Sequence, residues 1–191
     1  MKKKIAVCCM AVGLVLVLLA VALLGYNVYE NRRAKDNTDR VMQDLHRQII
    51  QEDETDPFDT EMRVVKINGY DYIGYLSLPT LNLNLPVLSG CDTARLTVAP
   101  CRYYGSTKTD NLVIAAHNYR SHFGYLGHLT VDAPVTFTDM EGTTSVYRVT
   151  EIGTLSPTAV DQVKYTKDDL ILYTCTYSGT KRIVVRCQYA Q

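Results

Sequence analysis

The sequence predicts an all-β domain that follows a single N-terminal membrane-spanning helix. The helix is indicated by residues 5–24, an unbroken apolar run, and the domain by a series of short apolar runs after residue 60. Glycine, proline, asparagine and aspartate separate the later runs, which is typical of short strands joined by turns. Many short strands with little helix indicate a barrel or a sandwich.

The N-terminal run is long enough to cross a bilayer. It contains 20 residues with neither charge nor proline, and at about 1.5 Å per residue such a helix spans about 30 Å. Lysines at positions 2–4 favour a cytoplasmic N-terminus, although three basic residues also follow the run closely. We expect a basic cytoplasmic tail over 1–4, a single-pass anchor in the cell membrane over 5–26, and an extracellular C-terminal domain.

A cleaved signal peptide is the alternative interpretation of this run. Ala20-Val21-Ala22 has the small-x-small form of a cleavage site. The run is longer than a signal core of about 7 to 15 residues, and it continues past that site through Leu23 and Leu24. We therefore predict an uncleaved anchor.

Residues 27–59 have the composition of a stalk. From residue 25 to residue 59 the chain holds five Lys or Arg, nine Asp or Glu and few large apolar residues. Val41, Leu45 and Ile49 recur at four-residue spacing, which indicates an amphipathic helix that lies on the domain, packs on a partner or caps its membrane-proximal end. We expect a solvated spacer, with a segment that covers the functional site as the alternative.

Residues 60–191 are enough for one domain with its own core. Alternate residues from Leu81 to Val87 are apolar, which is the pattern of a half-buried strand. The predicted strands are 72–78, 81–87, 111–116, 135–138, 145–152, 170–174 and 182–189.

Charge and motif content exclude several classes of protein. Residues 60–191 carry 12 Lys or Arg against 11 Asp or Glu without a basic cluster, so the surface of a nucleic-acid binder is missing. The chain has no phosphate-binding Gly-rich loop, no paired Cys-x-x-Cys spacing and no His-Glu-x-x-His helix. We therefore expect no nucleic-acid partner, no metal and no cofactor.

Three chemically active residues lie at predicted strand ends. Cys175 ends the run 170–174, Arg182 begins the next run, and His117 follows the run 111–116. Cysteine attacks a carbonyl as the thiolate, and histidine, with an ordinary pKa of about 6.5, can protonate a leaving amine. Arginine stays charged and can bind a carbonyl or an oxyanion. Together these residue types make a plausible acyl-transfer site.

Here the sequence resembles the sortases, the membrane-anchored cysteine transpeptidases of Gram-positive bacteria. Residues 171–175 resemble the Thr-Leu-x-Thr-Cys signature of that family, and the order His, Cys, Arg also fits. The resemblance covers roughly residues 72–189. Its segments are Gly74-Tyr75-Leu76-Ser77-Leu78-Pro79, Leu83-Asn84-Leu85-Pro86-Val87, Ala116-His117-Asn118, Ile171-Leu172-Tyr173-Thr174-Cys175 and Lys181-Arg182-Ile183-Val184-Val185.

Two departures leave the subclass of sortase open. Ile171 stands where the signature has threonine, which removes no reacting group. The stretch between Gly153 and Leu170 is too short for the long helical insertion of class B sortases, although the Arg-Ile-Val-Val run resembles theirs.

The resemblance implies an eight-stranded β-barrel and a transpeptidase mechanism over residues 60–191. Cys175 would attack the Thr–Gly bond of a Leu-Pro-x-Thr-Gly-like sorting signal, and His117 would protonate the departing amine. Arg182 would bind the substrate carbonyl and the oxyanion, and Thr174 would help to position the substrate backbone. The partners would be surface proteins with sorting signals and an amine acceptor, either a peptidoglycan precursor or a pilin lysine.

Other residues of the same types are expected to be structural. Cys187 shares a strand face with Ile183 and Val185, which favours a core position, and Cys91 and Cys101 are expected to be unpaired. Of the other histidines, His46 falls in the stalk, and His122 and His128 fall in a polar loop where we expect solvated or turn-forming side chains, with a place for one of them in the cleft as the alternative. Arg186 points to the same face as Arg182 but lies farther from the turn.

Two alternative functions share parts of this pattern. A cysteine hydrolase would use the same three residues with water as the acceptor. A non-catalytic membrane-anchored interaction module would have a buried cysteine and no thiol-dependent activity.

Overall fold

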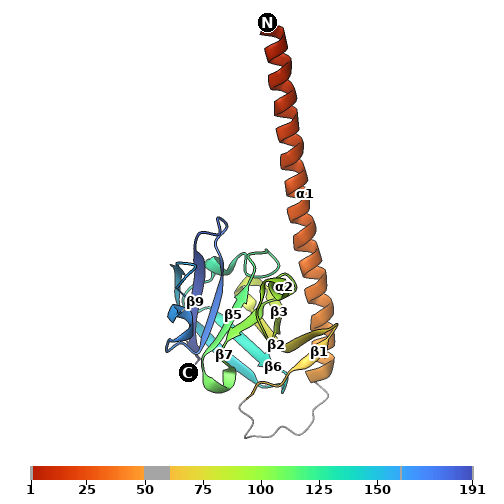
Figure 1. The fold of residues 1–191 in the computed structure, drawn as a ribbon. Coiled ribbons are helices and arrows are strands. Elements are labelled where there is room, and N and C mark those ends of the chain that lie inside the picture. The colour runs from red at the N-terminus through yellow and green to blue at the C-terminus, as the bar shows by residue number, and fades with distance from the viewer. Residues whose placement is uncertain (1, 50–60, 160, 191) are drawn as a thin grey trace. The chain divides into compact units, whose positions relative to one another are not determined.

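The computed structural model describes residues 2–49, 61–159 and 161–190. One long helix precedes a strand-rich region (Figure 1). The helices are α1 (Lys2–Ile49) and the single turns α2 (Thr93–Leu96) and α3 (Asp161–Lys164). The strands are β1 (Val65–Ile67), β2 (Tyr70–Leu78), β3 (Leu83–Leu88), β4 (Cys101–Tyr104), β5 (Leu112–Ala116), β6 (Pro134–Asp139), β7 (Thr144–Leu155), β8 (Leu170–Cys175) and β9 (Arg182–Tyr189).

The chain divides into two compact units, Met1–Arg33 and Ala34–Gln191. In the first unit the side chains of residues 9–29 are all exposed, although most of them are apolar up to Leu24. By length and composition this part of α1 could cross a membrane, a test that a signal sequence also passes. An uncleaved membrane anchor stays our prediction for this segment.

The second unit contains a closed barrel. In the described residues the strands follow each other around the barrel in the order β2-β3-β4-β5-β8-β9-β7-β6, and β6 pairs with β2 to close the ring. Strand β1 adds to the start of β2 outside this ring. The prediction of an eight-stranded barrel is confirmed, and closure leaves the eight strands without a free sheet edge.

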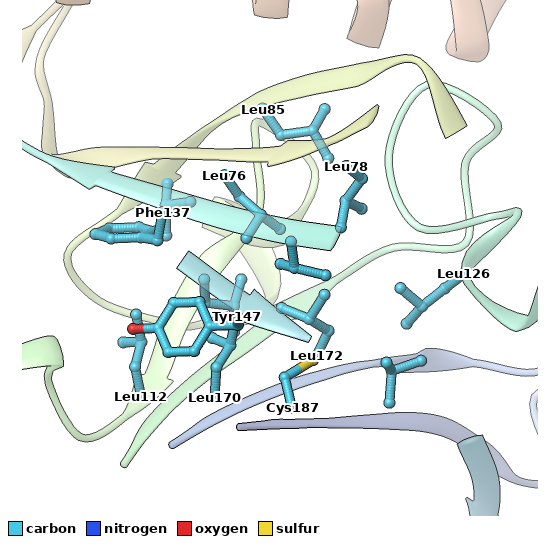
Figure 2. Packing of buried hydrophobic residues seen from close by; sticks show 14 of the residues in the cluster. Leu76, Leu78, Leu85, Leu112, Leu126, Phe137, Tyr147, Leu170, Leu172 and Cys187 are labelled. Atoms are coloured by element: carbon cyan, nitrogen blue, oxygen red, sulfur yellow. The ribbon is translucent and has the colours of Figure 1, made fainter. Parts of the chain in front are cut away.

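The interior of the barrel is filled by the inward faces of the strands. Leu85 and Val87 of β3 are buried there, as their alternation predicts. Figure 2 shows Leu76, Phe137, Leu172 and further side chains from other strands meeting in this core. Burial of a leucine or phenylalanine side chain contributes about 1.5–3 kcal/mol, so this core carries most of the stability of the barrel.

A second apolar cluster forms where the end of α1 packs on the outside of the barrel. Val41 and Leu45 are fully buried and pack in one cluster with Tyr72 of β2 and Leu88 of β3. All four belong to the unit that begins at Ala34. Of the roles that the sequence leaves open for the helix of residues 41–49, packing on the domain is therefore the one observed.

Several strand boundaries differ from the prediction. Strands β1 and β4 were missed, and both are short with mostly half-exposed or exposed side chains, so they lack a strong periodic signal. The strand predicted from Leu81 begins at Leu83, because Pro79–Leu81 forms a 3-10 turn that ends on Asn82 in the left-handed conformation. Strand β7 continues to Leu155. Between β7 and β8 the described residues contain only the single turn α3, as the short spacing predicts.

Candidate functional site

The three residues predicted to react lie at the ends of three neighbouring strands at one rim of the barrel, His117 directly after β5, Cys175 at the end of β8 and Arg182 at the start of β9. Strands β5 and β8 are parallel, with Ala116 opposite Thr174, so His117 and Cys175 each follow at the next position. Strand β9 is antiparallel to β8, and Cys175 is directly opposite Arg182. Because neighbouring strands are about 4.8 Å apart, this register puts histidine and arginine on the two sides of the cysteine.

Cysteine and arginine share the outer face of the barrel. Side chains alternate along a strand, so Cys175 points to the same side as Tyr173, and Arg182 to the same side as Val184. Tyr173 and Val184 belong to an apolar cluster on the outside of β5, β8 and β9, distinct from the core. Cys175 is partly exposed there as a free thiol. The core reading of a lone cysteine at a strand end does not fit this position.

The side chain of Thr174 links β8 to β5. Its side chain is 2% exposed, and its hydroxyl donates a hydrogen bond to the carbonyl of Ala116 at 2.8 Å. The hydroxyl thus points into the barrel. It joins the residue before the cysteine to the residue before the histidine.

His117 is half-buried at the start of the loop that leaves β5. Burial lowers the pKa of its imidazole below the ordinary value, because the charged form loses hydration. The ring centroid of Tyr119 lies 5.0 Å from that of His117. The backbone N–H of Phe123 donates to the carbonyl of His117 at 3.2 Å, and Phe123 is fully buried in the core.

The two arginines on the outer face of β9 differ in their partners. Arg182 donates to the carbonyls of Gly179 and Lys181, and within the described part of the chain it has no ion pair. Arg186 forms ion pairs with Asp168 and Glu151. The salt-bridge interpretation therefore holds for Arg186 and not for Arg182.

A hollow of about 140 Å³ opens on the same outer face, next to Arg182. Its lining is mainly aromatic and aliphatic and comes from β4, the end of β7, the segment around α3, β8 and β9. The lining residues are Tyr103, Leu155, Ser156, Pro157, Ala159, Val163, Tyr173, Arg182 and Val184. Cys175 is outside this set, but it is the register partner of Arg182.

Three further cysteines of the barrel unit, Cys91, Cys101 and Cys187, are free thiols. Cys187 is fully buried in the core, as its strand face predicts. Cys91 and Cys101 do not form a disulfide, and the pKa of the Cys101 thiol is raised because it donates a hydrogen bond to Cys91 and is buried. In the residues that the structure describes, no group of three or more His, Cys, Asp or Glu side chains could hold a metal ion.

The two loop histidines differ: both lie in turns, as one of the predicted alternatives has it, but only one of them is solvated. His128 is exposed, as expected, but His122 is fully buried. Burial with the charge of nearby His117 lowers the pKa of His122 to about 4. The adjacent Phe123, an apolar residue in a polar loop, was the one sequence signal that this part of the loop turns into the protein.

Comparison with known proteins agrees with this geometry. The family model for the sortase domain matches residues 76–190. Sortase C of Streptococcus pneumoniae is similar in structure, with a TM-score of 0.65 and 19% identity over 80% of this chain and 97% of that one. Sortase C1 of Streptococcus agalactiae gives 0.64 and 20% over 80% and 98%. A lid mutant of sortase A from Corynebacterium diphtheriae gives 0.57 and 22% over 80% and 93%.

No curated protein sequence gives a significant match. At these identities the similar structures establish the fold alone, and the family rests on the match to the sortase domain. The chain belongs to the sortase family, whose membership implies a cysteine transpeptidase.

Proposed function

We propose that this protein is a membrane-anchored transpeptidase that cleaves a Leu-Pro-x-Thr-Gly-like sorting signal and joins the cleaved protein to an amine. The observation that carries the proposal is the register of β5, β8 and β9, with Ala116 opposite Thr174 and Cys175 opposite Arg182. This register brings His117, Cys175 and Arg182 to neighbouring positions, which supports their assignment as acid–base, nucleophile and cation.

The reaction divides into two acyl transfers. The Cys175 thiolate attacks the threonine carbonyl, the Thr–Gly bond breaks, and the imidazolium of His117 gives its proton to the departing glycine amine. The product is a thioacyl enzyme with neutral His117. An incoming amine then attacks the thioester, gives a proton to His117, and releases Cys175 as the thiolate.

Arg182 is assigned to the oxyanion that forms in both steps. Its guanidinium donates to two main-chain carbonyls of the β8–β9 turn, which hold it near the cysteine and leave further N–H donors for a substrate oxygen. Thr174 acts indirectly, because its side chain is buried. Its hydrogen bond to the Ala116 carbonyl positions Cys175 relative to His117. The hollow beside Arg182 would take the apolar Leu-Pro part of the signal.

Burial of His117 bears on the rate of this reaction. A lowered imidazole pKa means that less of the enzyme carries imidazolium at neutral pH. Since the first step needs thiolate and imidazolium together, the active protonation state is a minority species. The substrate adds apolar surface to the site and also excludes water from it.

The localisation and partners follow from the same proposal. The apolar part of α1 anchors the chain in the cell membrane with its N-terminus in the cytoplasm, and the barrel acts outside on surface proteins that carry sorting signals. The acceptor amine belongs to a peptidoglycan precursor or to a pilin lysine.

The test is the fate of the acyl group. Full-length protein in detergent micelles is incubated with fluorescent sorting-signal peptides, with and without added glycine oligomers, and products are separated by chromatography and mass spectrometry. We expect an amide product that increases with amine concentration at the expense of acid. Acid alone at every amine concentration would replace the proposal with a hydrolase. No thiol-dependent product with any peptide would leave a non-catalytic module.

A further inference from the structure

The loop that carries His117 is held in a tight turn around Tyr119. The carbonyl of Tyr119 accepts hydrogen bonds from the backbone N–H of His122 at 2.9 Å and of Gly124 at 2.8 Å. A Cβ at Gly124 would lie 2.7 Å from the Tyr119 carbonyl oxygen and 2.8 Å from that of Asn118. Both contacts are with backbone, so glycine is required for this turn. The backbone position of Tyr119 is therefore fixed.

The ring of Tyr119 is flanked by two imidazoles. Its centroid lies 5.0 Å from that of His117, with the ring planes 38° apart, and 5.5 Å from that of His122, with the planes 51° apart. His122 is fully buried, and neither of its ring nitrogens has a hydrogen-bond partner in the described residues. Packing thus holds His122, and His122 in turn supports the side of the Tyr119 ring.

An aromatic ring at this distance discriminates between the two forms of His117. A cation within about 6 Å of a tyrosine ring centroid is attracted by the negative face of the ring, and the attraction increases where water is excluded. Burial opposes the imidazolium form of His117, as its lowered pKa indicates. The Tyr119 ring opposes that effect and also limits rotation of the imidazole.

We propose that Tyr119 is a positioning residue for His117: its ring, supported by His122, holds the imidazole toward Cys175 and favours its protonated form. The inference rests on the proposed acid–base role of His117. The other titratable or charged groups next to His117 in the register or on its loop are the Cys175 thiol on β8, the Arg182 guanidinium on β9, and Arg120 and His122.

The experiment compares three variants of the full chain in detergent micelles. Tyr119→Phe keeps the ring, and Tyr119→Leu removes it while it fills a similar volume. Tyr125→Leu is the matched control, because Tyr125 forms the same kind of tilted ring pair with exposed His128, at 5.4 Å and 38°. We measure kcat, KM and their pH dependence with a sorting-signal peptide, and thermal unfolding for each variant.

A second readout does not depend on activity. With ¹³C-labelled histidine, NMR titration follows the four imidazoles of the chain, and a His117→Gln sample assigns the His117 signal. We expect Tyr119→Leu to lower the His117 pKa by about half a unit or more and kcat by about 10-fold with little change in KM. Tyr119→Phe, which keeps the ring, should retain more of both than Tyr119→Leu, and Tyr125→Leu should stay close to wild type.

A Tyr119→Leu variant that folds and retains both the wild-type kcat and the His117 titration overturns the inference, as does a Tyr119→Phe variant that loses as much as Tyr119→Leu. If Tyr119→Leu does not fold, Tyr119→Met replaces it in the same comparison. If the wild type transfers no acyl group, the proposed function fails, while the shift of the His117 titration still tests the contact between the rings.

Discussion

The two ends of the β8–β9 pair differ in how their polar groups are satisfied. At the far end, Arg186 is paired with Asp168 and Glu151, and Asp169 accepts a hydrogen bond from the backbone N–H of Tyr189 at 2.7 Å. At the rim near Cys175, Arg182 has carbonyl partners and, in the described ranges, no carboxylate.

The loop after β5, which begins at the same rim, contains buried polar atoms without hydrogen-bond partners in the described residues. His117 is held in a site that disfavours its charged form, and His122 is buried with two ring nitrogens that have no partner among the described residues. Buried polar groups without partners cost about 1–3 kcal/mol each. The contrast teaches that one end of the strand pair stabilises the fold, whereas the other gives up stability in the way that functional sites commonly do.

The comparison is tested most strongly at Arg182. Replacement by alanine should reduce kcat/KM about 10²–10³-fold, because an oxyanion donor is lost, and should change the free energy of unfolding by no more than about 0.5 kcal/mol. Arg182→Lys keeps the charge but not the planar fork, so we expect an intermediate loss. Steady-state kinetics with a sorting-signal peptide measure both. A fully active Arg182→Ala variant would show that Arg182 has no part in the reaction.

The pH dependence of stability should report His122. Its folded pKa of about 4 lies below the ordinary 6.5, so the unfolded chain binds more protons between these values and stability falls as pH falls. The loss should reach roughly 3 kcal/mol between pH 6.5 and 4, and the lowered pKa of His117 adds to it in the same direction. Denaturant unfolding of a chain that begins at Ala34, the start of the compact unit, measures this slope.

His122→Phe is the control for this slope, because it keeps a ring of similar size without the titratable nitrogens. The variant should be more stable than wild type at pH 4 and should have a shallower slope. An unchanged slope in His122→Phe would show that other groups cause the acid sensitivity.

The stabilising role of the far end of the β8–β9 pair is tested at Arg186. Its side chain is 19% exposed, and Asp168 opposite is 16% exposed, so removal of the arginine leaves a poorly hydrated carboxylate. We expect Arg186→Ala to lose about 2 kcal/mol of stability and less than threefold in kcat. A double-mutant cycle with Asp168→Asn isolates the pair. Equal loss of activity in Arg186→Ala and Arg182→Ala would erase the distinction between the two ends.

The smallest expected effect concerns the hydrogen bond between Thr174 and Ala116. Thr174→Val keeps the shape of the side chain and removes its donor to the Ala116 carbonyl. The free energy of unfolding should fall by about 1 kcal/mol. We expect kcat to fall more than KM rises, because Cys175 is then less well positioned relative to His117. Thr174→Ser should restore most of both. Full activity in Thr174→Val would show that the Thr174 hydroxyl contributes to stability and not to catalysis.

The sequence predicted the parts of this molecule that depend on local patterns. Apolar runs separated by turn residues identified seven of the barrel strands, and alternation supported the one that contains Leu83, Leu85 and Val87. Cys175, His117 and Arg182 were selected because each lies at the end of one of these runs, although the runs alone did not show that the three residues meet. The short strand β4 was missed because four residues give little periodicity. Closure of the barrel needed the family resemblance, since pairing between β2 and β6 joins segments about 60 residues apart.

Other features depend on tertiary context that no local pattern carries. The burial of His122 comes from the turn that Gly124 permits, and the different partners of Arg182 and Arg186 come from the position of Asp168 in another segment. The docking of Val41 and Leu45 on the barrel was one of three roles that their spacing allowed. Spacing predicts an apolar helix face, whereas its partner is set by the fold.

The central claim is that Cys175 carries the acyl group between two partners, and its most direct test is an intact-mass measurement. Full-length protein in micelles is mixed with a panel of sorting-signal peptides and quenched in acid, with Cys175→Ala as the control. We predict a mass increase equal to the N-terminal peptide fragment on wild type alone, lost on treatment with hydroxylamine. No adduct with any peptide, together with a Cys175 that resists alkylation in the folded protein, would contradict the account.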